Sequence, residues 1–415
     1  MKKKTLLVIV NDALEYKIIF NDYVFKPLLA KYEITIASPV SKDPRFREDV
    51  TSQYPVDFLD YFPTVKIADF WRNKDYFALT NAFIYYYLKK IPFYILNQSH
   101  SESVFQALSM WTFWSGDAVL KEKNYRIRRL IFTLLKMLIY PFKNIIYGSF
   151  LYIRNPRIKN ARKYDGILFA RPDNLAHIEL YFNHAIPGKT KIYTLCRNFD
   201  GPSLKGIYTI PSQYTLYYDD DLKKHIKSAL DSRFVGKLVK IPFYLKPRNI
   251  KGKASKIRVI FASTQHKFAR NQGKYFEVLY ESLKKIYRTN FELILRLHYE
   301  DEVRSYHMKN KENVIIDKEY YVNYLTYADK TQDFSSQKTV RVFAKVLKGA
   351  HFLFTCGSTI VYEASFFGIK SYFLNFNHEL DPLYKRDHLR ILIGKGTKVI
   401  LDKKMLTSVL KKMSK

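Results

Sequence analysis

A turn of one glycine and two hydroxyl residues is the stretch of this chain whose residue types most suggest ligand chemistry. Gly357, Ser358 and Thr359 follow the apolar run 352–354 and open a helical stretch that carries Glu363. Glycine permits a tight turn, and the start of a helix, with about half a positive charge, attracts a phosphate. Glu363 falls on the same helical face as Thr359 and can accept hydrogen bonds from two sugar hydroxyls. The same residues also suit a helix cap that binds no ligand.

Polar residues follow other apolar runs in the same half of the chain. Ser263 comes directly after the run 257–262, and His298 follows the run 291–297, which also contains Arg296. Because the carboxyl ends of parallel strands meet at one edge of a sheet, we expect these side chains to lie beside the Gly-Ser-Thr turn. A lone histidine is usually structural, but one that shares an edge with an anion-binding turn is a candidate for ligand contact.

The N-terminal half places carboxylates in similar positions. Asp12 follows the apolar run 6–10, and Asp200 lies with Lys205 in the glycine-containing loop 198–206. A carboxylate at the end of a strand can act as a general base, and Lys205 can offer a positive charge to a phosphate. Two structural alternatives remain, because Asp12 can cap the next helix and Asp200 can belong to an ordinary Asp-Gly-Pro turn.

The elements that must position these residues alternate between short apolar runs and helical stretches, which is the pattern of an α/β fold with parallel sheets. A chain of 415 residues, 47% of them hydrophobic, is long enough for two domains with full cores. We predict two Rossmann-like, doubly wound domains that face a cleft, residues 1–245 and residues 246–415, with a polar linker at 246–256. An aromatic-rich helical insertion is predicted within the first domain, at about residues 63–160.

The formal net charge of +32 predicts an anionic partner. No acidic residue lies between Glu122 and Asp165, where basic residues interrupt apolar runs. The segment 130–147 falls short of the roughly 20 apolar residues that span a bilayer, but it can lie on an anionic membrane surface. The basic residues expected at that surface are Arg126, Arg128, Arg129, Lys136 and Lys143. The alternative is a buried helix whose basic side chains reach solvent. We do not expect nucleic-acid binding, because no recognition motif accompanies the charge.

Cysteine usage fits a reducing cytoplasm. Cys196 and Cys356 are the two cysteines of the chain, so neither a disulfide framework nor a cysteine-based zinc site is expected. The first residues are similar to the beginning of a signal peptide, but the apolar run ends after Val10, and we interpret it as a first strand. These features predict a cytoplasmic protein that binds peripherally to the inner face of the cell membrane.

Two motifs of the C-terminal half resemble those of a known family. A strand that ends in Arg296-x-His298 precedes the motif Gly-Ser-Thr-x-x-x-Glu-Ala-x-x-x-Gly, which runs from Gly357 to Gly368. Together they are similar to the GT-B glycosyltransferases of bacterial surface-polysaccharide synthesis. Related capsule transferases carry a His-Pro motif and a serine or threonine pair, whereas Tyr299 follows His298 here.

Two further stretches extend the resemblance along the chain. The loop 198–206 is similar to an Asp-Asn-Leu-Thr-Ser-Lys-Gly stretch of some predicted transferases of that group, although Gly201 replaces the asparagine. The stretch Asp387-His-Leu-Arg resembles a late histidine-bearing segment of the same group. The aromatic insertion has no counterpart in the resemblance.

The resemblance implies transfer of a sugar from a nucleotide-activated donor to a lipid-linked or surface glycan acceptor, such as lipopolysaccharide or capsule, without a metal or other cofactor. The acceptor would bind the N-terminal domain, with Asp200 or Asp12 as the base. The donor would contact Arg296, His298, Gly357, Ser358, Thr359, Glu363, Lys205 and Ser263. Alternatives are a nucleotide-sugar 2-epimerase of the same fold, a polyol-phosphate transferase that uses CDP-glycerol, and a non-catalytic membrane or nucleic-acid adaptor.

Overall fold

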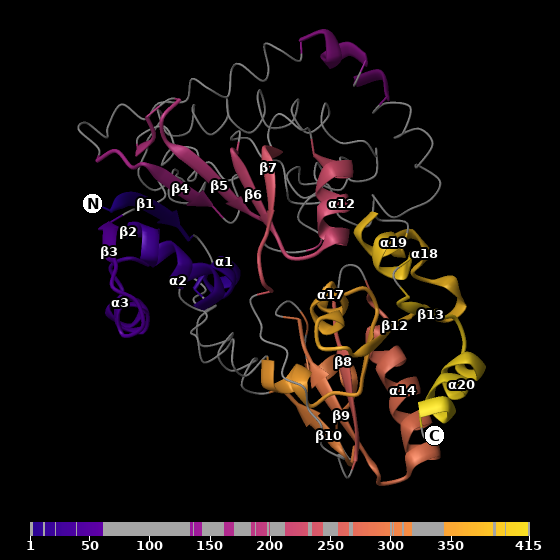
Figure 1. The fold of residues 1–415 in the computed structure, drawn as a ribbon. Helices are drawn as coiled ribbons and strands as arrows, with labels where there is room; N and C mark the ends of the chain where they lie inside the picture. The colour runs from indigo at the N-terminus through magenta and orange to yellow at the C-terminus, as the bar shows by residue number, and fades with distance from the viewer. Residues whose placement is uncertain are drawn as a thin grey trace, which may run out of the picture. The chain divides into compact units, whose positions relative to one another are not determined.

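The chain forms two compact units, Met1–Tyr244 and Leu245–Lys415 (Figure 1). The computed structural model describes residues 3–10, 13–20, 22–38, 40–60, 133–135, 137–142, 162–169, 184–186, 188–196, 199, 212–230, 235–243, 256–264, 269–298, 301, 303–308, 311–317, 344–384, 387–394 and 396–413. The predicted insertion at about residues 63–160 lies outside these ranges except for 133–135 and 137–142. No helix in these ranges is long and apolar enough to cross a bilayer.

The N-terminal unit is built on a seven-stranded parallel sheet in the order β3-β2-β1-β4-β5-β6-β7. Its strands are β1 (Lys4–Ile9), β2 (Tyr32–Ser38), β3 (Asp57–Asp60), β4 (Gly166–Phe169), β5 (Lys191–Leu195), β6 (Tyr214–Tyr217) and β7 (Lys237–Lys240). Its described helices are α1 (Ala13–Ile19), α2 (Asp22–Lys31), α3 (Pro44–Thr51), η3 (Tyr140–Phe142) and α12 (Asp220–Ala229). The last four residues of β1 are fully buried, as expected for a strand covered on both faces.

The C-terminal unit contains a six-stranded parallel sheet in the order β10-β9-β8-β11-β12-β13. Its strands are β8 (Ile257–Ala262), β9 (Phe291–Arg296), β10 (Val314–Ile316), β11 (Phe352–Thr355), β12 (Lys370–Leu374) and β13 (Lys398–Ile400). Its described helices are α14 (Gln272–Tyr287), η6 (Val303–Tyr306), α17 (Ile360–Ser365), η7 (Phe376–His378), α18 (Asp381–Tyr384), α19 (Asp387–Gly394) and α20 (Lys403–Met413). The chain moves outward from β8 to β10 and then from β11 to β13, so the sheet is doubly wound.

Helix α14 covers the C-terminal sheet with one apolar face. Phe276, Leu279 and Leu283 recur at helical spacing and are fully buried. At the end of α14, the Tyr287 hydroxyl donates to the carbonyl of Leu410 over 2.6 Å, which ties α14 to α20. Figure 1 shows α20 beside α14.

The two parallel sheets confirm the predicted α/β class with two doubly wound domains. Strand β8 has the bounds that its apolar run predicts, whereas β3, β7 and β13 were not predicted. All three are edge strands of three or four residues that begin with a charged residue, so their apolar runs are too short to stand out in the sequence.

Candidate functional site

The candidate site lies where the winding of the C-terminal sheet reverses. Strands β8 and β11 are neighbours, although the chain visits β9 and β10 between them. Ala262, at the end of β8, is level with Arg296 of β9 on one side and with Thr355 of β11 on the other. Ligands of doubly wound sheets bind outside the carboxyl ends of strands at such a point. The structure therefore brings the segments after these three strands to one edge.

The turn after β11 is tighter and more self-contained than its sequence suggests. Gly357 has φ +146°, and a Cβ added there would lie 2.6 Å from Leu383 Cδ2. The N–H groups of Gly357 and Ser358 donate to Thr355 Oγ1 over 3.3 and 3.1 Å. We expected these N–H groups to face a ligand. Because Thr355 accepts both, the turn offers a ligand mainly its hydroxyls and the Thr359 N–H.

The remaining polar groups of this turn are accessible. Ser358 and Thr359 are half-buried, and the Ser358 hydroxyl accepts weakly from the N–H of Ile360 at 3.4 Å. Thr359 precedes α17 without a side-chain capping bond, and Glu363 follows in the first turn, also half-buried. Two hydroxyls and a carboxylate thus line one side of the edge, and these groups suit the hydroxyls and phosphate of a nucleotide.

Ser263 holds the adjacent histidine. Its side chain is 3% exposed, and its Oγ accepts the backbone N–H of His298 at 2.6 Å. The Ser263 N–H in turn donates to the carbonyl of Arg296 over 2.9 Å. His298 itself is half-buried. The structure therefore brings Ser263, Arg296 and His298 together at the strand ends, as predicted. The Ser263 hydroxyl is used within the protein, because it binds the backbone N–H of His298.

Arg296 forms a buried ion pair with another residue of the same unit. Its Nη1 donates to Asp317 Oδ2 over 2.6 Å, and the two side chains are 8% and 4% exposed. Arg296 ends β9 and Asp317 follows β10, so the ion pair joins two neighbouring strand ends. Sequence reasoning did not identify Asp317, because nothing in the sequence shows which acid faces Arg296.

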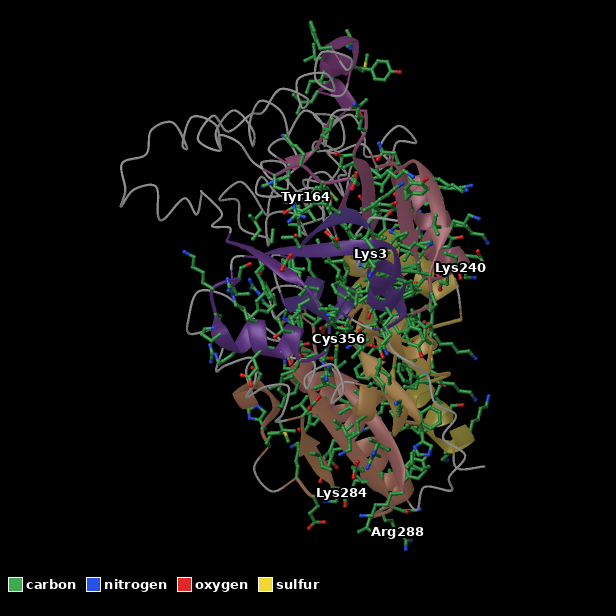
Figure 2. The ribbon with its side chains drawn as sticks, turned by 60° about the vertical axis from the view of Figure 1, so that its left-hand side comes forward. Lys3, Tyr164, Lys240, Lys284, Arg288 and Cys356 are labelled. Carbon is green, nitrogen blue, oxygen red and sulfur yellow. The ribbon has the colours of Figure 1, made fainter. Side chains whose placement is uncertain are left out.

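A buried polar cluster follows His298 in the chain, and the Asp301 N–H donates to the carbonyl of His298 over 2.9 Å. The Tyr306 hydroxyl donates to Asp301 Oδ2, and both residues are buried. Asp301 Oδ1 has no hydrogen-bond donor among the described residues. Burial raises the pKa of the Cys356 thiol, and the carboxylates of Asp301 and Glu379 raise it further. Cys356, which is labelled in Figure 2, is fully buried and is therefore a protonated thiol, which is a poor nucleophile.

The segment after β12 adds polar residues that the sequence did not reveal. Asn375 donates through Nδ2 to Asp381 Oδ1 over 2.7 Å. Glu379 accepts from the Tyr275 hydroxyl at 2.9 Å and from Asn271 Nδ2 at 3.2 Å. These bonds connect the loop after β12 to the start of α14. The edge of the sheet is thus closed by hydrogen bonds between elements far apart in the chain.

The other predicted site residues lie outside the described part of the chain: Asp12, Asp200, Lys205, Arg126, Arg128, Arg129, Lys136 and Lys143. Their roles stay predictions. His388, from the late histidine-bearing segment, is 3% exposed on α19. Within the described residues no group of three or more histidine, cysteine, aspartate or glutamate side chains is arranged to hold a metal ion.

The chain is similar in fold to solved structures described as 2-epimerases and as a glycotransferase. No family model and no curated protein matches its sequence. A candidate UDP-N-acetylglucosamine 2-epimerase from Listeria monocytogenes aligns with a TM-score of 0.50 and 10% identity, over 100% of this chain and 89% of its own. The UDP-GlcNAc 2-epimerase of Methanocaldococcus jannaschii, in complex with UDP-GlcNAc and UDP, has a TM-score of 0.47 and 10% identity, over 99% and 92% of the two chains. The glycotransferase of kitacinnamycin aligns with a TM-score of 0.46 and 11% identity, over 100% of this chain and 91% of its own. The chain therefore has the two-domain GT-B fold.

Proposed function

We propose that this protein is a metal-independent glycosyltransferase that moves a sugar from a nucleotide-activated donor to a lipid-linked or surface glycan acceptor, such as lipopolysaccharide or capsule. The observation that supports this proposal is the reversal point of the C-terminal sheet. The segment with His298 follows β9, and the segment with Ser358, Thr359 and Glu363 follows β11, at the same edge of that sheet. These groups have the chemistry that a sugar nucleotide requires.

The proposed roles follow from the charge that develops when the donor bond breaks. The departing nucleotide phosphate gains negative charge, which His298, Lys205 and the hydroxyls of Ser358 and Thr359 would stabilise. Glu363 would accept hydrogen bonds from the ribose. Arg296 would act indirectly, since its ion pair with Asp317 fixes the strand ends that carry His298.

The acceptor hydroxyl needs a base if the transfer inverts the sugar. Asp200 and Asp12 are the proposed candidates, both from the N-terminal unit. A carboxylate can take the proton as the hydroxyl attacks the anomeric carbon, while the nucleotide leaves with the bonding electrons. No bound cofactor is required by this proposal.

A nucleotide-binding screen tests the proposal. We expect one class among UDP-, GDP-, CDP-, CMP- and dTDP-linked sugars to raise the melting temperature, because ligand at about 100 times its Kd stabilises a protein by roughly 2.7 kcal/mol. Ser358→Ala should reduce this shift. Ser365→Ala, at the other end of α17, is the matched control and should retain it. Absence of stabilisation by every class would refute the donor site.

A nucleotide-sugar 2-epimerase is the second candidate, because the Listeria monocytogenes neighbour carries that description. The two reactions differ in their products. Incubation of the identified donor without acceptor should leave its sugar configuration unchanged if the protein is a transferase. Epimerised donor, without release of nucleotide, would replace the transferase proposal with the epimerase.

An exposed apolar stripe supports a peripheral membrane location and hence a lipid-linked acceptor. The stripe consists of Leu134, Met137, Leu138, Tyr140 and Phe142, with exposures of 49%, 67%, 68%, 53% and 57%. The first three share one face of a helical turn. Large exposed apolar side chains within a basic segment are typical of a surface that enters the headgroup region of an anionic bilayer.

A further inference from the structure

The loop between β12 and α18 presents a histidine at the edge of the C-terminal sheet where the donor is proposed to bind. Strand β12 pairs in parallel with β11, and Phe373 is level with Thr355. The loop that follows β12 therefore lies at the same edge as the Gly-Ser-Thr turn. In this loop the side chain of His378 is 61% exposed. This residue has no role in the site described above.

Helix α18, at the end of this loop, packs against the turn. A Cβ added at Gly357 would lie 2.6 Å from Leu383 Cδ2, so the helix touches the turn directly. The Tyr384 hydroxyl lies 3.1 Å from the carbonyl oxygens of both Cys356 and Leu374. These contacts connect α18 to the ends of β11 and β12, so the loop is held beside the turn.

The backbone of the loop has an unusual conformation at two successive residues. Asn377 and His378 have φ of +54° and +61°. Residues other than glycine adopt this left-handed region uncommonly, although asparagine and histidine tolerate it better than most. Such conformations cluster at functional sites, where the surrounding structure maintains them. Here the N–H of Asn377 donates to the carbonyl of Leu401 over 3.1 Å.

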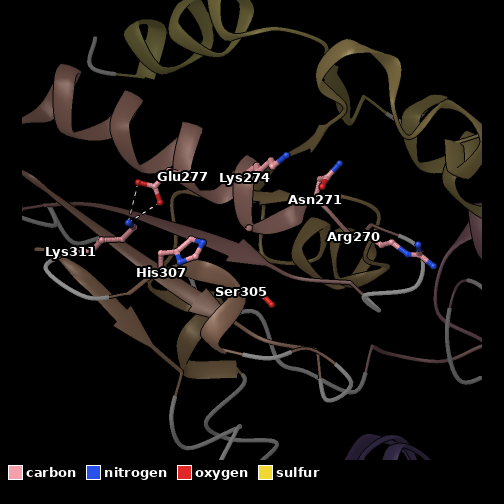
Figure 3. Close-up of a pocket in the computed structure, with 8 residues that line it drawn as sticks. Arg270, Asn271, Lys274, Glu277, Ser305, His307 and Lys311 are labelled. Carbon is pink, nitrogen blue, oxygen red and sulfur yellow. Dashed lines mark hydrogen bonds and ion pairs between the residues drawn. The ribbon is translucent and has the colours of Figure 1, made fainter.

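Glu379, the next residue, fastens the loop to helix α14. It accepts from the Tyr275 hydroxyl at 2.9 Å and from Asn271 Nδ2 at 3.2 Å. Asn271 lies at the start of α14 and lines the pocket that Figure 3 shows. The residues on both sides of His378 are thus bonded to other elements, whereas its imidazole is exposed.

Asp381 fixes the hydrogen-bonding role of this imidazole. His378 Nδ1 lies 3.3 and 3.2 Å from the two carboxylate oxygens of Asp381. Asn375, which is 1% exposed, donates through Nδ2 to Asp381 Oδ1 over 2.7 Å and so holds the carboxylate in place. Because an ionised carboxylate can only accept, Nδ1 carries the proton. In the neutral imidazole Nε2 is then an acceptor.

We propose that His378 accepts a hydrogen bond from a hydroxyl group of the donor sugar, with Asp381 as its positioning residue. The inference rests on the proposed donor site, since the turn 357–359 would bring the sugar nucleotide to this loop. A phosphate has only acceptor oxygens when ionised, so an acceptor nitrogen suits a hydroxyl instead. Glu363 is already proposed for the ribose, which leaves the sugar as the partner of His378.

Calorimetric titration with a sugar nucleotide and with its nucleotide alone tests the proposal. The two probes are the UDP-, GDP-, CDP-, CMP- or dTDP-linked sugar that stabilises the protein most, and the same nucleotide without its sugar. We expect His378→Asn to weaken binding of the sugar nucleotide roughly two- to tenfold, because one hydrogen bond is lost. Binding of the nucleotide alone should not change. Asparagine tolerates the left-handed backbone, but its side chain is too short to reach the position of Nε2.

His351→Asn is the matched control. His351 is also exposed but precedes β11, at the opposite edge of the sheet, so this variant should bind both probes like the unchanged protein. Asp381→Asn should weaken only the sugar nucleotide, because the new amide can donate to Nδ1 and move the proton to Nε2. The nitrogen NMR signals of the His378 imidazole should report this change of tautomer.

Two results would overturn the sugar contact while the donor site stands. One is an equal loss of affinity for both probes in His378→Asn. The other is unchanged binding of both probes in that variant while Ser358→Ala weakens both. If the unchanged protein binds neither probe, the proposed donor site fails, and the contact with His378 fails with it.

Discussion

At the scale of single residues, the ion pair between Arg296 and Asp317 leads to a prediction about stability. Removing one charge of a buried pair leaves the other without compensation, which costs about 3–5 kcal/mol. With side-chain exposures of 8% and 4%, this pair meets that condition. We expect Asp317→Asn to lower the free energy of unfolding by about 3 kcal/mol or more, measured by urea denaturation.

The matched control is the ion pair between Arg258 and Glu292 in the same sheet. Arg258 Nε lies 2.5 Å from Glu292 Oε1, but the side chains are 40% and 22% exposed. Solvent screens such a pair, so Arg258→Gln should cost less than about 1 kcal/mol. Equal losses in the two variants would contradict the structural role assigned to Arg296.

Residue types were easier to predict than residue partners. Ser263, His298 and the turn 357–359 reach the same edge because each follows a parallel strand, and strand ends can be identified from apolar runs. The acceptor for Arg296 depends on how β9 and β10 pair, which a single sequence does not reveal. Thr355 is the clearest case, since it reads as a strand residue but accepts two N–H groups that we expected to face a ligand.

At the scale of elements, the junction between β11 and α17 depends on Gly357. Its φ of +146° lies where side chains other than hydrogen are strained, and a Cβ would also meet Leu383. We expect Gly357→Ala to destabilise the protein by about 1–3 kcal/mol and to weaken nucleotide binding, because the hydroxyls of the turn would shift. Chemical denaturation and the nucleotide thermal shift measure the two effects.

Gly394, at the end of α19, is the control for this substitution. A Cβ there would meet no atom within 4 Å, and its φ is not in the positive region. Gly394→Ala should be neutral or slightly stabilising, because alanine favours the helix and restricts the unfolded chain. A Gly357→Ala protein as stable as Gly394→Ala would show that the turn tolerates a side chain.

Elements could be predicted where they are long or central. Strand β8 lies in the middle of its sheet, and four of its six residues are buried, so its apolar run defines it. Strand β7 lies at an edge, begins and ends with lysine, and has no buried residue. Half-exposed edge strands resemble loops in sequence. The central strands of both sheets were therefore predicted, whereas the edge strands β3, β7 and β13 were not.

At the scale of the whole molecule, the exposed apolar stripe predicts membrane binding. Burying a large apolar side chain is worth about 1.5–3 kcal/mol, so Met137 and Leu138 together would contribute strongly to attachment. We expect the double substitution Met137→Glu and Leu138→Glu to reduce co-flotation with anionic liposomes by more than tenfold. Neutralising Arg126, Arg128 and Arg129 should also weaken flotation, and high salt should mask that second effect.

Exposed apolar surface elsewhere provides the control. Ile315, on β10 of the other unit, is 46% exposed, and Ile315→Glu introduces the same kind of charge away from the stripe. If the stripe is the membrane contact, Ile315→Glu should float like the unchanged protein, and neutral liposomes should capture less protein than anionic ones. Equal flotation of all variants would show that residues 134–142 do not enter the bilayer. The lipid-linked acceptor would then lose its main support, while the donor site, which rests on the C-terminal sheet, would be unaffected.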